Sequence, residues 1–279
     1  MQPATEKAIA GLCVVGLLMV FWSAAAWTPL YDWNGARFYP AYLLAAGEQL
    51  YHPVGVGVVN GWIYGPGLPL VLAPVTLIPD PTWAMFTAAW INFATLFGPL
   101  VVIMLALVGK ALPMRRRMLF ALFVTALIML VPTTCRRLVF ITCDQLAIGL
   151  GVISCFILSR ALQATGQRAR LLYWLAAATA VASMWSKQTE VVLPVAQVIF
   201  LWWRGPRRRA VGYTAELAVA FLVSLAVLVA WSGWSALWFN LVWIPSHHPL
   251  ATGEQSLGAR LLWGVLDGLP LVAAAAWGL

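Results

Sequence analysis

The sequence has few charged residues for its length. Only 9% of its 279 residues are Asp, Glu, Lys or Arg, whereas a soluble protein carries about 25%. Apolar residues make up 62%, and several apolar runs exceed the length of an ordinary core helix. This composition excludes soluble, disordered, collagen-like and nucleic-acid-binding classes, and it predicts an all-α membrane protein that spans a lipid bilayer.

The apolar runs predict a polytopic bundle of about eight transmembrane helices, forming a single domain over residues 1–279. A further apolar stretch, 66–79, contains Pro69 and Pro74. It is too short to cross a hydrocarbon layer of about 30 Å, so we interpret it as re-entrant or interfacial. The predicted spans are 8–28, 83–109, 118–132, 146–163, 171–185, 190–203, 211–231 and 261–279.

The distribution of Lys and Arg predicts the orientation in the membrane. With the N-terminus in the cytoplasm, 12 of the 17 cations lie on the cytoplasmic side, in agreement with the positive-inside rule. Loops 29–82 and 232–257 then lie on the outer face. A cleaved secretory signal ending in the small residues 24–26 is the alternative for the first span. We favour an uncleaved anchor, because the apolar run continues to Trp27 and the later spans need no separate signal.

Three groups of polar residues fall near span ends on the predicted outer face. Cations there oppose the positive-inside bias, so they need a separate explanation. Arg and Lys at headgroup depth suit a phosphate group, because charge-assisted hydrogen bonds to phosphate strengthen where water is scarce. Folding can bring the groups around one pocket, which predicts a site. The groups are Asp32 with Arg37, Arg136 and Arg137 with Asp144 and Gln145, and Lys187 with Gln188 and Glu190.

A structural explanation is open for each group taken alone. Asp32 would then be a solvated loop acid. The pairs Arg137–Asp144 and Lys187–Glu190 would merely neutralise charge near the membrane. We favour a site because three such groups share one face.

The last predicted outer loop is rich in tryptophan. Such rings line sugar sites, and they are also ordinary anchors at a membrane interface. His247 and His248 could accept or relay a proton, but adjacent histidines lack the spacing that brings two ligands to one metal, so no metal is expected. The sequence has no DxD, CxxC, Walker or GxSxG motif, which leaves nucleotide-dependent and serine-hydrolase chemistry without support. Cys135 and Cys143 leave a disulfide and two free thiols equally open.

Two consecutive segments carry a resemblance to a known family. DWNGARFYPAYLLAAGEQLYHP, from Asp32, and WIYGPGLPLVLAPVTLIPD, from Trp62, resemble the first outer loop of the GT-C membrane glycosyltransferases. The likeness is to glycosyltransferase family 87 in particular, the DUF2029 proteins. GEQSLGARL, from Gly253, resembles the family's Asn-Gln-Ser-Leu motif, although Glu254 replaces the Asn. The other matching positions are Tyr39, Leu43, Leu44, Gly47, Tyr51, Tyr64, Pro66, Ile78, Pro79, Gln145 and Lys187, and Cys143-Asp144 departs from the small residue before the family's Gln.

The resemblance implies a mannosyltransferase that takes its sugar from a polyprenyl-phosphate donor, with inversion at the anomeric carbon. Asp32 would be the general base, and Arg136, Arg137 and Lys187 would bind the departing phosphate. The acceptor would be a lipid or a glycan, and neither a metal nor a cofactor is required. The residues expected to position substrate are Tyr39, Tyr64, Asp144, Gln145, Gln188, His247, His248, Gln255 and Arg260.

Two other functions remain as alternatives. A lipid or solute transporter would also contain broken helices and charges near the membrane, but the sequence shows no internal repeat and its ionisable residues gather at one face. A non-catalytic membrane subunit is the second alternative. Family members are usually longer, so we expect some C-terminal spans to be missing or supplied otherwise. The expected location is a bacterial cytoplasmic membrane, with the active site on the outer face.

Overall fold

All regular structure in the described part of the chain is helical, which confirms the all-α prediction there. Among the described residues, three helices are long and apolar enough to cross a membrane: α4 (Pro81–Leu107, with its candidate span at Pro81–Ile103), α7 (Cys143–Gln163) and α10 (Arg207–Ser232). They match the predicted spans 83–109, 146–163 and 211–231. The structure is a computed structural model that describes residues 3–56, 62–107, 113, 140–205 and 207–247.

Three further helices form where the sequence predicts spans. They are α1 (Pro3–Trp27), α8 (Gly166–Ser186) and α9 (Val192–Arg204). Whether each of them crosses the bilayer remains a prediction. The shortest, α9, is only 13 residues long and would extend about 20 Å. The predicted spans 118–132 and 261–279 lie outside the described residues. The count of about eight transmembrane helices is therefore not confirmed.

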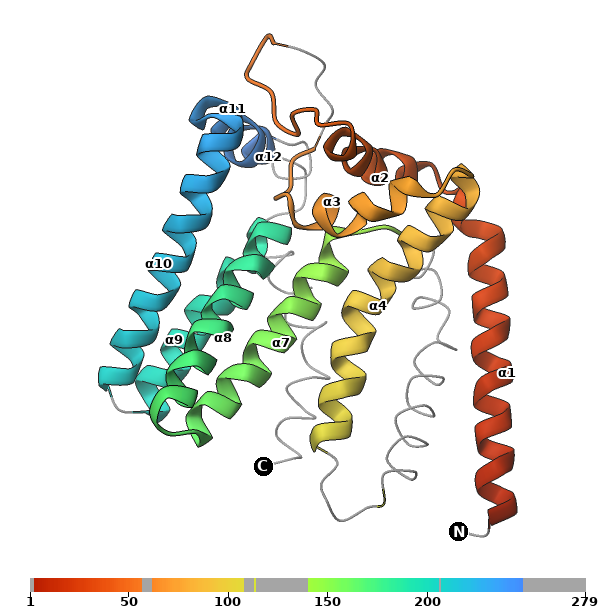
Figure 1. Cartoon of the computed structure of the whole chain (residues 1–279), viewed down its shortest axis with the longest axis horizontal. Helices are drawn as coiled ribbons and strands as arrows, with labels where there is room; N and C mark the ends of the chain where they lie inside the picture. Colours follow the sequence, from red (N-terminus) through yellow and green to blue (C-terminus); the bar gives the residue numbers. More distant parts are fainter. Residues whose placement is uncertain (1–2, 57–61, 108–112, 114–139, 206, 248–279) are drawn as a thin grey trace.

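Short helices gather at one end of the bundle, which we call the cap end (Figure 1). It contains α2 (Asp32–Ala45), α3 (Gly67–Leu72), α11 (Trp234–Trp238) and α12 (Ile244–Ser246), together with the start of α7 and the end of α8. The opposite end carries the turns that join α7 to α8 and α9 to α10. The long helices run between these two ends, so a residue at the cap end of a helix is separated from a residue at its opposite end by the full length of that helix.

The stretch interpreted as re-entrant or interfacial forms two short helices rather than a span. α3 is followed directly by the 3-10 helix η2 (Ala73–Leu77), whose first turn contains Pro74. Proline is tolerated there because the first N–H groups of a helix have no partner within it. Leu68, Leu72 and Val75 are buried and belong to the apolar cluster of the cap end. These contacts hold the two short helices across the bundle end.

Close backbone contact joins α4 to α7. A Cβ atom at Gly149 would overlap the carbonyl oxygen of Thr95, so the two helices can approach this closely only with glycine at that position. Small residues commonly permit such contacts between helices in membranes. α7 in turn packs against α8 as an antiparallel hairpin, which places the first turn of α7 beside the last turn of α8.

A buried polar network ties α7, α8, α9 and α10 together. The Tyr213 hydroxyl donates to Gln197 Oε1 at 2.7 Å, and Gln197 Nε2 donates to Ser154 Oγ at 2.9 Å. The Ser154 hydroxyl then donates to the carbonyl of Ala176 at 2.7 Å. Polar side chains in a membrane bundle stabilise helix contacts through such bonds, each by about 0.6–2 kcal/mol. The network fixes the four helices as one unit.

Candidate functional site

The segment just before α7 is fixed by side chains from distant parts of the chain. Arg37 Nη1 donates to the carbonyl of Ile141 at 3.1 Å, and Asn34 Oδ1 accepts from the Ile141 N–H at 2.8 Å. Asn92 Nδ2 donates to the carbonyl of Phe140 at 3.3 Å. These bonds fix where α7 begins. The first turn of a helix presents unpaired N–H groups and a partial positive charge, and here it faces the cap end.

An ion pair joins the first turn of α7 to the residue that follows α8. The Lys187 ammonium group binds Asp144 Oδ1. The Lys187 side chain is 25% exposed and that of Asp144 is 52% exposed, so a ligand can reach both charges. Within the described residues, the Glu190 carboxylate forms no ion pair with Lys187. Glu190 instead contacts Lys187 through its backbone N–H, which donates to the Lys187 carbonyl at 3.0 Å. The local pair considered from the sequence is therefore not the one that forms.

The loop 62–66 packs directly on the end of α8. A Cβ atom at Gly65 would overlap the carbonyl of Trp185, so only glycine allows this approach. Gln188 Nε2 donates to the carbonyl of Ile63 at 2.7 Å. These contacts hold the loop beside Lys187, in the region where the sequence resembles the family's first outer loop.

Tyr64 contributes its backbone to this arrangement. The Tyr51 hydroxyl donates to the Tyr64 carbonyl at 2.8 Å, and the Tyr64 ring lies edge-on to Trp62 with 5.5 Å between centroids. Burial raises the pKa of Tyr51 well above its ordinary value, because the charged phenolate would lose its hydration. Tyr51 therefore stays protonated and donates this bond at neutral pH.

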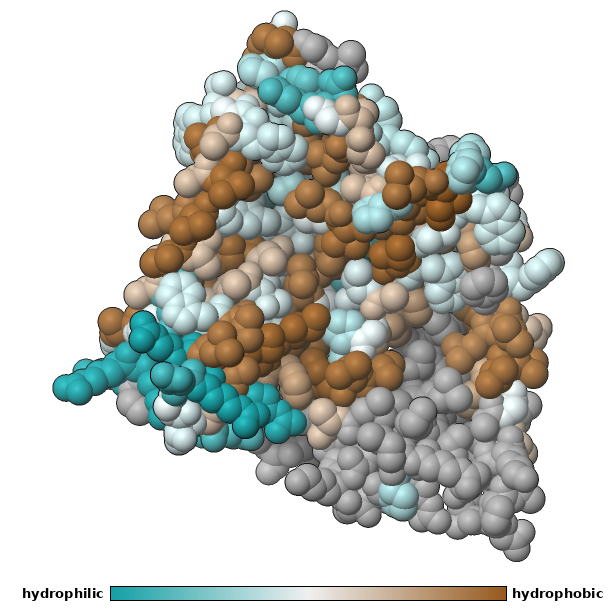
Figure 2. All heavy atoms as spheres, in the orientation of Figure 1, coloured by the Kyte–Doolittle hydropathy of each residue, from teal (hydrophilic) through white to brown (hydrophobic). Residues whose placement is uncertain are grey.

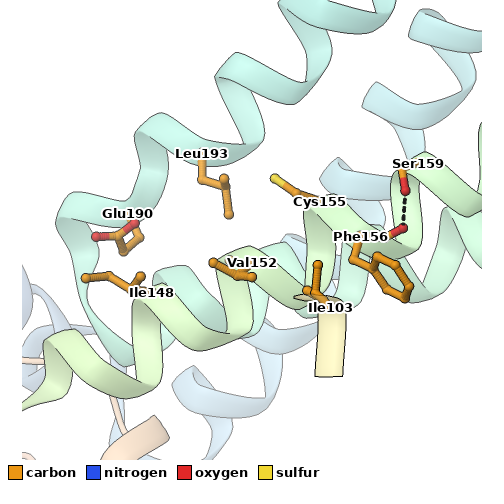
Figure 3. Close-up of a pocket in the computed structure, with 9 residues that line it drawn as sticks. Ile103, Ile148, Val152, Cys155, Phe156, Ser159, Glu190 and Leu193 are labelled. Atoms are coloured by element: carbon orange, nitrogen blue, oxygen red, sulfur yellow. Dashed lines mark hydrogen bonds between the residues drawn. The ribbon is translucent and has the colours of Figure 1, made fainter. Parts of the chain in front are cut away.

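An apolar groove runs along α7 (Figure 3). Its volume is about 460 Å³, within the range of ligand pockets. Ile148, one helical turn after Asp144, and Glu190 lie at one end of the groove, and Phe156 and Ser159 lie at the other. The groove is lined by Ile103, Ile148, Gly151, Val152, Cys155, Phe156, Ser159, Glu190 and Leu193.

The predicted general base is placed only by its backbone. Asp32 is the first residue of α2, and its side chain lies outside the described part of the structure. Asn34 is two residues further on and bonds Ile141, so the Asp32 Cα atom lies within about 8 Å of the Asn34 Cα atom. The backbone of the predicted base is thus close to the segment that leads into α7.

Other predicted residues have different environments. Tyr39 is 46% exposed on α2, and Gln145 is buried with its Nε2 donating to the carbonyl of Phe140 at 3.4 Å. The structure brings Asp144, Lys187 and Gln188 together. The predicted residues Arg136, Arg137, His248, Gln255 and Arg260 lie outside the described residues.

His247 ends the aromatic segment at the cap end. Its ring stacks on Trp243 with 4.4 Å between centroids, and its Nδ1 lies 2.8 Å from the Trp243 carbonyl. A carbonyl oxygen only accepts, so Nδ1 carries the proton in this contact and Nε2 is the acceptor of the neutral ring. Within the described residues, no contact joins His247 to Lys187 or Asp144.

No protein-family profile, curated protein or solved structure matches this chain. The likeness to GT-C glycosyltransferases remains a prediction from short motifs. Sequence reasoning grouped Arg37 with Asp32 but gave it no role of its own, and it assigned no part in the site to Asn34 and Asn92. Arg37 was visible only as an outward cation, and the two asparagines gave no signal because their partners in the segment before α7 lie at least 48 residues away. Cys143 is a buried free thiol, and Cys135 lies outside the described residues.

Proposed function

We propose that the protein is a membrane glycosyltransferase that takes a sugar, with mannose as the first candidate, from a polyprenyl-phosphate donor. One observation carries the proposal: the residues next to the accessible Lys187–Asp144 pair line one end of the apolar groove, since Ile148 is one helical turn after Asp144 and Glu190 is three residues after Lys187. A polyprenyl phosphate is an anionic group on a long apolar chain. It needs a cation and an apolar channel side by side, which is the arrangement here.

The phosphate would bind at the cap end of α7. Lys187 supplies a full positive charge, Arg37 lies at the preceding segment, and the helix start adds a partial positive charge. In the absence of substrate, Asp144 neutralises Lys187. A phosphate, with its greater charge and three acceptor oxygens, would compete with Asp144 for the ammonium group. Arg136 and Arg137 are proposed to join this group.

The proposed reaction is a single displacement. Asp32 takes the proton from the acceptor hydroxyl as its oxygen forms a bond to the anomeric carbon of the sugar. The bond between that carbon and the phosphate oxygen breaks, and the phosphate leaves with the electron pair. Lys187 and Arg37 stabilise the charge on the departing phosphate. Attack opposite the leaving group inverts the anomeric centre.

The remaining predicted residues divide into two groups. Gln145 and Gln188 commit their amide N–H groups to backbone carbonyls, so we assign them to holding the site in shape. Tyr39 and His247 are exposed at the cap end and have polar atoms available to an acceptor hydroxyl. We assign these two to the acceptor side, with His248, Gln255 and Arg260.

The purified full chain, reconstituted in phosphatidylcholine vesicles, tests the proposal. It is incubated with radiolabelled polyprenyl-phosphate mannose and a lipid extract, and the products are separated and counted. The expected result is transfer of the label to a new glycolipid or glycan, with release of polyprenyl phosphate. The variant Lys187→Met should lose most of this transfer.

A matched control uses Glu48→Gln, which removes an exposed charge from the same predicted outer loop and should transfer normally. Movement of the labelled donor across the vesicle membrane without formation of a glycosidic bond would contradict the proposal and support a transporter. Absence of both activities with a correctly folded protein would support a non-catalytic subunit.

A further inference from the structure

Seven arginines lie at the end of the bundle opposite the cap end, which we call the arginine end. All seven side chains are exposed. They come from two turns, one between α7 and α8 and one between α9 and α10. Figure 2 shows hydrophilic side chains gathered in this lower part of the molecule, directly against apolar surface. The seven are Arg160, Arg168, Arg170, Arg204, Arg207, Arg208 and Arg209.

Packing between the helices brings the two turns together. The rings of Tyr173 on α8 and Tyr213 on α10 lie 6.1 Å apart. Arg170 is three residues before Tyr173, and Arg209 is four residues before Tyr213, so each arginine lies about one helical turn from this ring pair. The buried residues Leu158, Leu201 and Ala210, from α7, α9 and α10, belong to the same apolar cluster. The arginines of both turns therefore form one surface.

Few carboxylates neutralise this surface. Within the described residues none of the seven arginines forms an ion pair, and the acidic side chain whose charge interacts with Arg170 is Glu216. Cations gathered on one surface repel one another, which is unfavourable unless counter-anions gather on them. The surface is thus complementary to a partner with several negative charges.

Tryptophan contacts indicate the depth of these arginines in the membrane. The Arg204 guanidinium lies 5.9 Å from the Trp203 ring centre, and that of Arg207 lies 5.8 Å from Trp202. Trp203 is 82% exposed and Trp202 is 52% exposed. Exposed indole rings next to apolar helix surface settle at the headgroup level of a bilayer. Guanidinium groups held against these rings lie at the same level, where lipid phosphates are.

We propose that the arginine end is a binding surface for the phosphate headgroups of anionic phospholipids, on the side that the sequence predicts to be cytoplasmic. The positive-inside rule requires only that cations be in excess on this side, and it does not require them to cluster. Among the described residues the arginines are clustered, form no ion pair with a carboxylate, and include two that contact interface tryptophans, and together these features fit phosphates arranged in a membrane plane. The inference is independent of the proposed transferase activity.

The relative affinity of the full chain for anionic and neutral lipid tests the inference. The protein is reconstituted in phosphatidylcholine vesicles containing spin-labelled phosphatidylglycerol or spin-labelled phosphatidylcholine, and the immobilised fraction is measured by electron paramagnetic resonance. We expect phosphatidylglycerol to be preferred at least about fivefold, since each cation near an anionic surface contributes about that factor. About 0.5 M salt should remove most of the preference, because it screens exposed charges.

In the variant Arg168→Gln/Arg170→Gln/Arg208→Gln/Arg209→Gln, the ratio of the affinities for phosphatidylglycerol and phosphatidylcholine should fall close to one. These four side chains contact no aromatic ring in the described part of the structure, so their removal leaves the tryptophan contacts in place. Lysine at the same four positions keeps the charge and should keep most of the preference. This lysine variant is the control for misfolding and for changed orientation.

Three results would overturn the inference. The first is an unchanged preference for phosphatidylglycerol in the glutamine variant. The second is an equal loss in the lysine and glutamine variants, which would indicate a disturbed fold rather than lost charge. The third is displacement of the labelled lipid by soluble polyglutamate at equal charge concentration, which would make the surface a site for soluble polyanions.

Discussion

The two ends of the bundle both carry cations but use them differently. At the cap end, Arg37 bonds the carbonyl of Ile141 and Lys187 pairs with Asp144, so each of these two cations has an acceptor oxygen in a fixed position. At the arginine end the seven arginines are exposed and form no ion pair among the described residues, and three of them, Arg160, Arg204 and Arg207, contact aromatic rings. A defined ligand group needs cations that are already held in position. A fluid membrane surface needs only a local excess of charge.

The ends also differ in how the chain assembles them. Cap-end contacts join residues far apart in the sequence, such as Arg37 with Ile141, and Gln188 with Ile63. The arginine end is made of two turns that each connect neighbouring helices. A site with fixed geometry therefore depends on the complete tertiary structure, whereas a charged surface depends mainly on local sequence.

The largest effect is expected for the predicted base at the cap end. Asp32→Asn should lower the rate of sugar transfer by at least about 100-fold, because general base catalysis contributes about 10² to 10⁴. The melting temperature should not change. The radiolabel assay measures the rate, with Glu48→Gln as the control. Normal transfer by Asp32→Asn would remove the catalytic role from the cap end.

A second change tests the packing that supports the groove. Gly149→Ala should lower the free energy of unfolding by about 1–3 kcal/mol, because the added methyl group forces α4 away from α7 at Thr95. Gly98→Ala on α4 is the matched control. Its new methyl group would meet no atom within 4 Å. Replacing glycine by alanine inside a helix should therefore raise the free energy of unfolding by about 0.5–1 kcal/mol. Thermal unfolding in detergent compares the two, and equal melting temperatures would show that the close contact has no energetic role.

The third change separates a functional role of Lys187 from a structural one. Lys187→Met should reduce transfer by about tenfold or more and raise KM for the donor. Its stability should change by less than about 1 kcal/mol, since the pair with Asp144 is partly exposed. A large loss of stability with unchanged KM would instead mean that the pair only joins α7 to α8.

The smallest effect is expected in the buried network near the arginine end. Tyr213→Phe removes the hydrogen bond to Gln197 Oε1 and should lower the free energy of unfolding by about 0.5–1 kcal/mol. Tyr173 is the matched control, because its buried hydroxyl has no hydrogen-bond partner within the described structure. Tyr173→Phe should be neutral or stabilising. If the two variants unfold alike, the network does not help to hold the arginine end together.

Hydropathy alone determined much of the fold. The apolar runs predicted helices at 83–109, 146–163 and 211–231, where the structure has α4, α7 and α10. The prolines at 69 and 74 correctly indicated that 66–79 does not form a span. These features depend on the transfer of apolar side chains out of water and on backbone hydrogen bonding within a segment, which are local properties of the chain.

Only the tertiary structure decided how the candidate site is assembled. The sequence predicted that Asp144 and Lys187 belong to one outward site, but their pairing appeared only when α7 and α8 were packed side by side. The bond from Arg37 to Ile141 and the groove beside α7 were not visible in any motif. Which polar groups meet depends on helix rotation and on close contacts such as that at Gly149, and these are set by packing over the whole bundle.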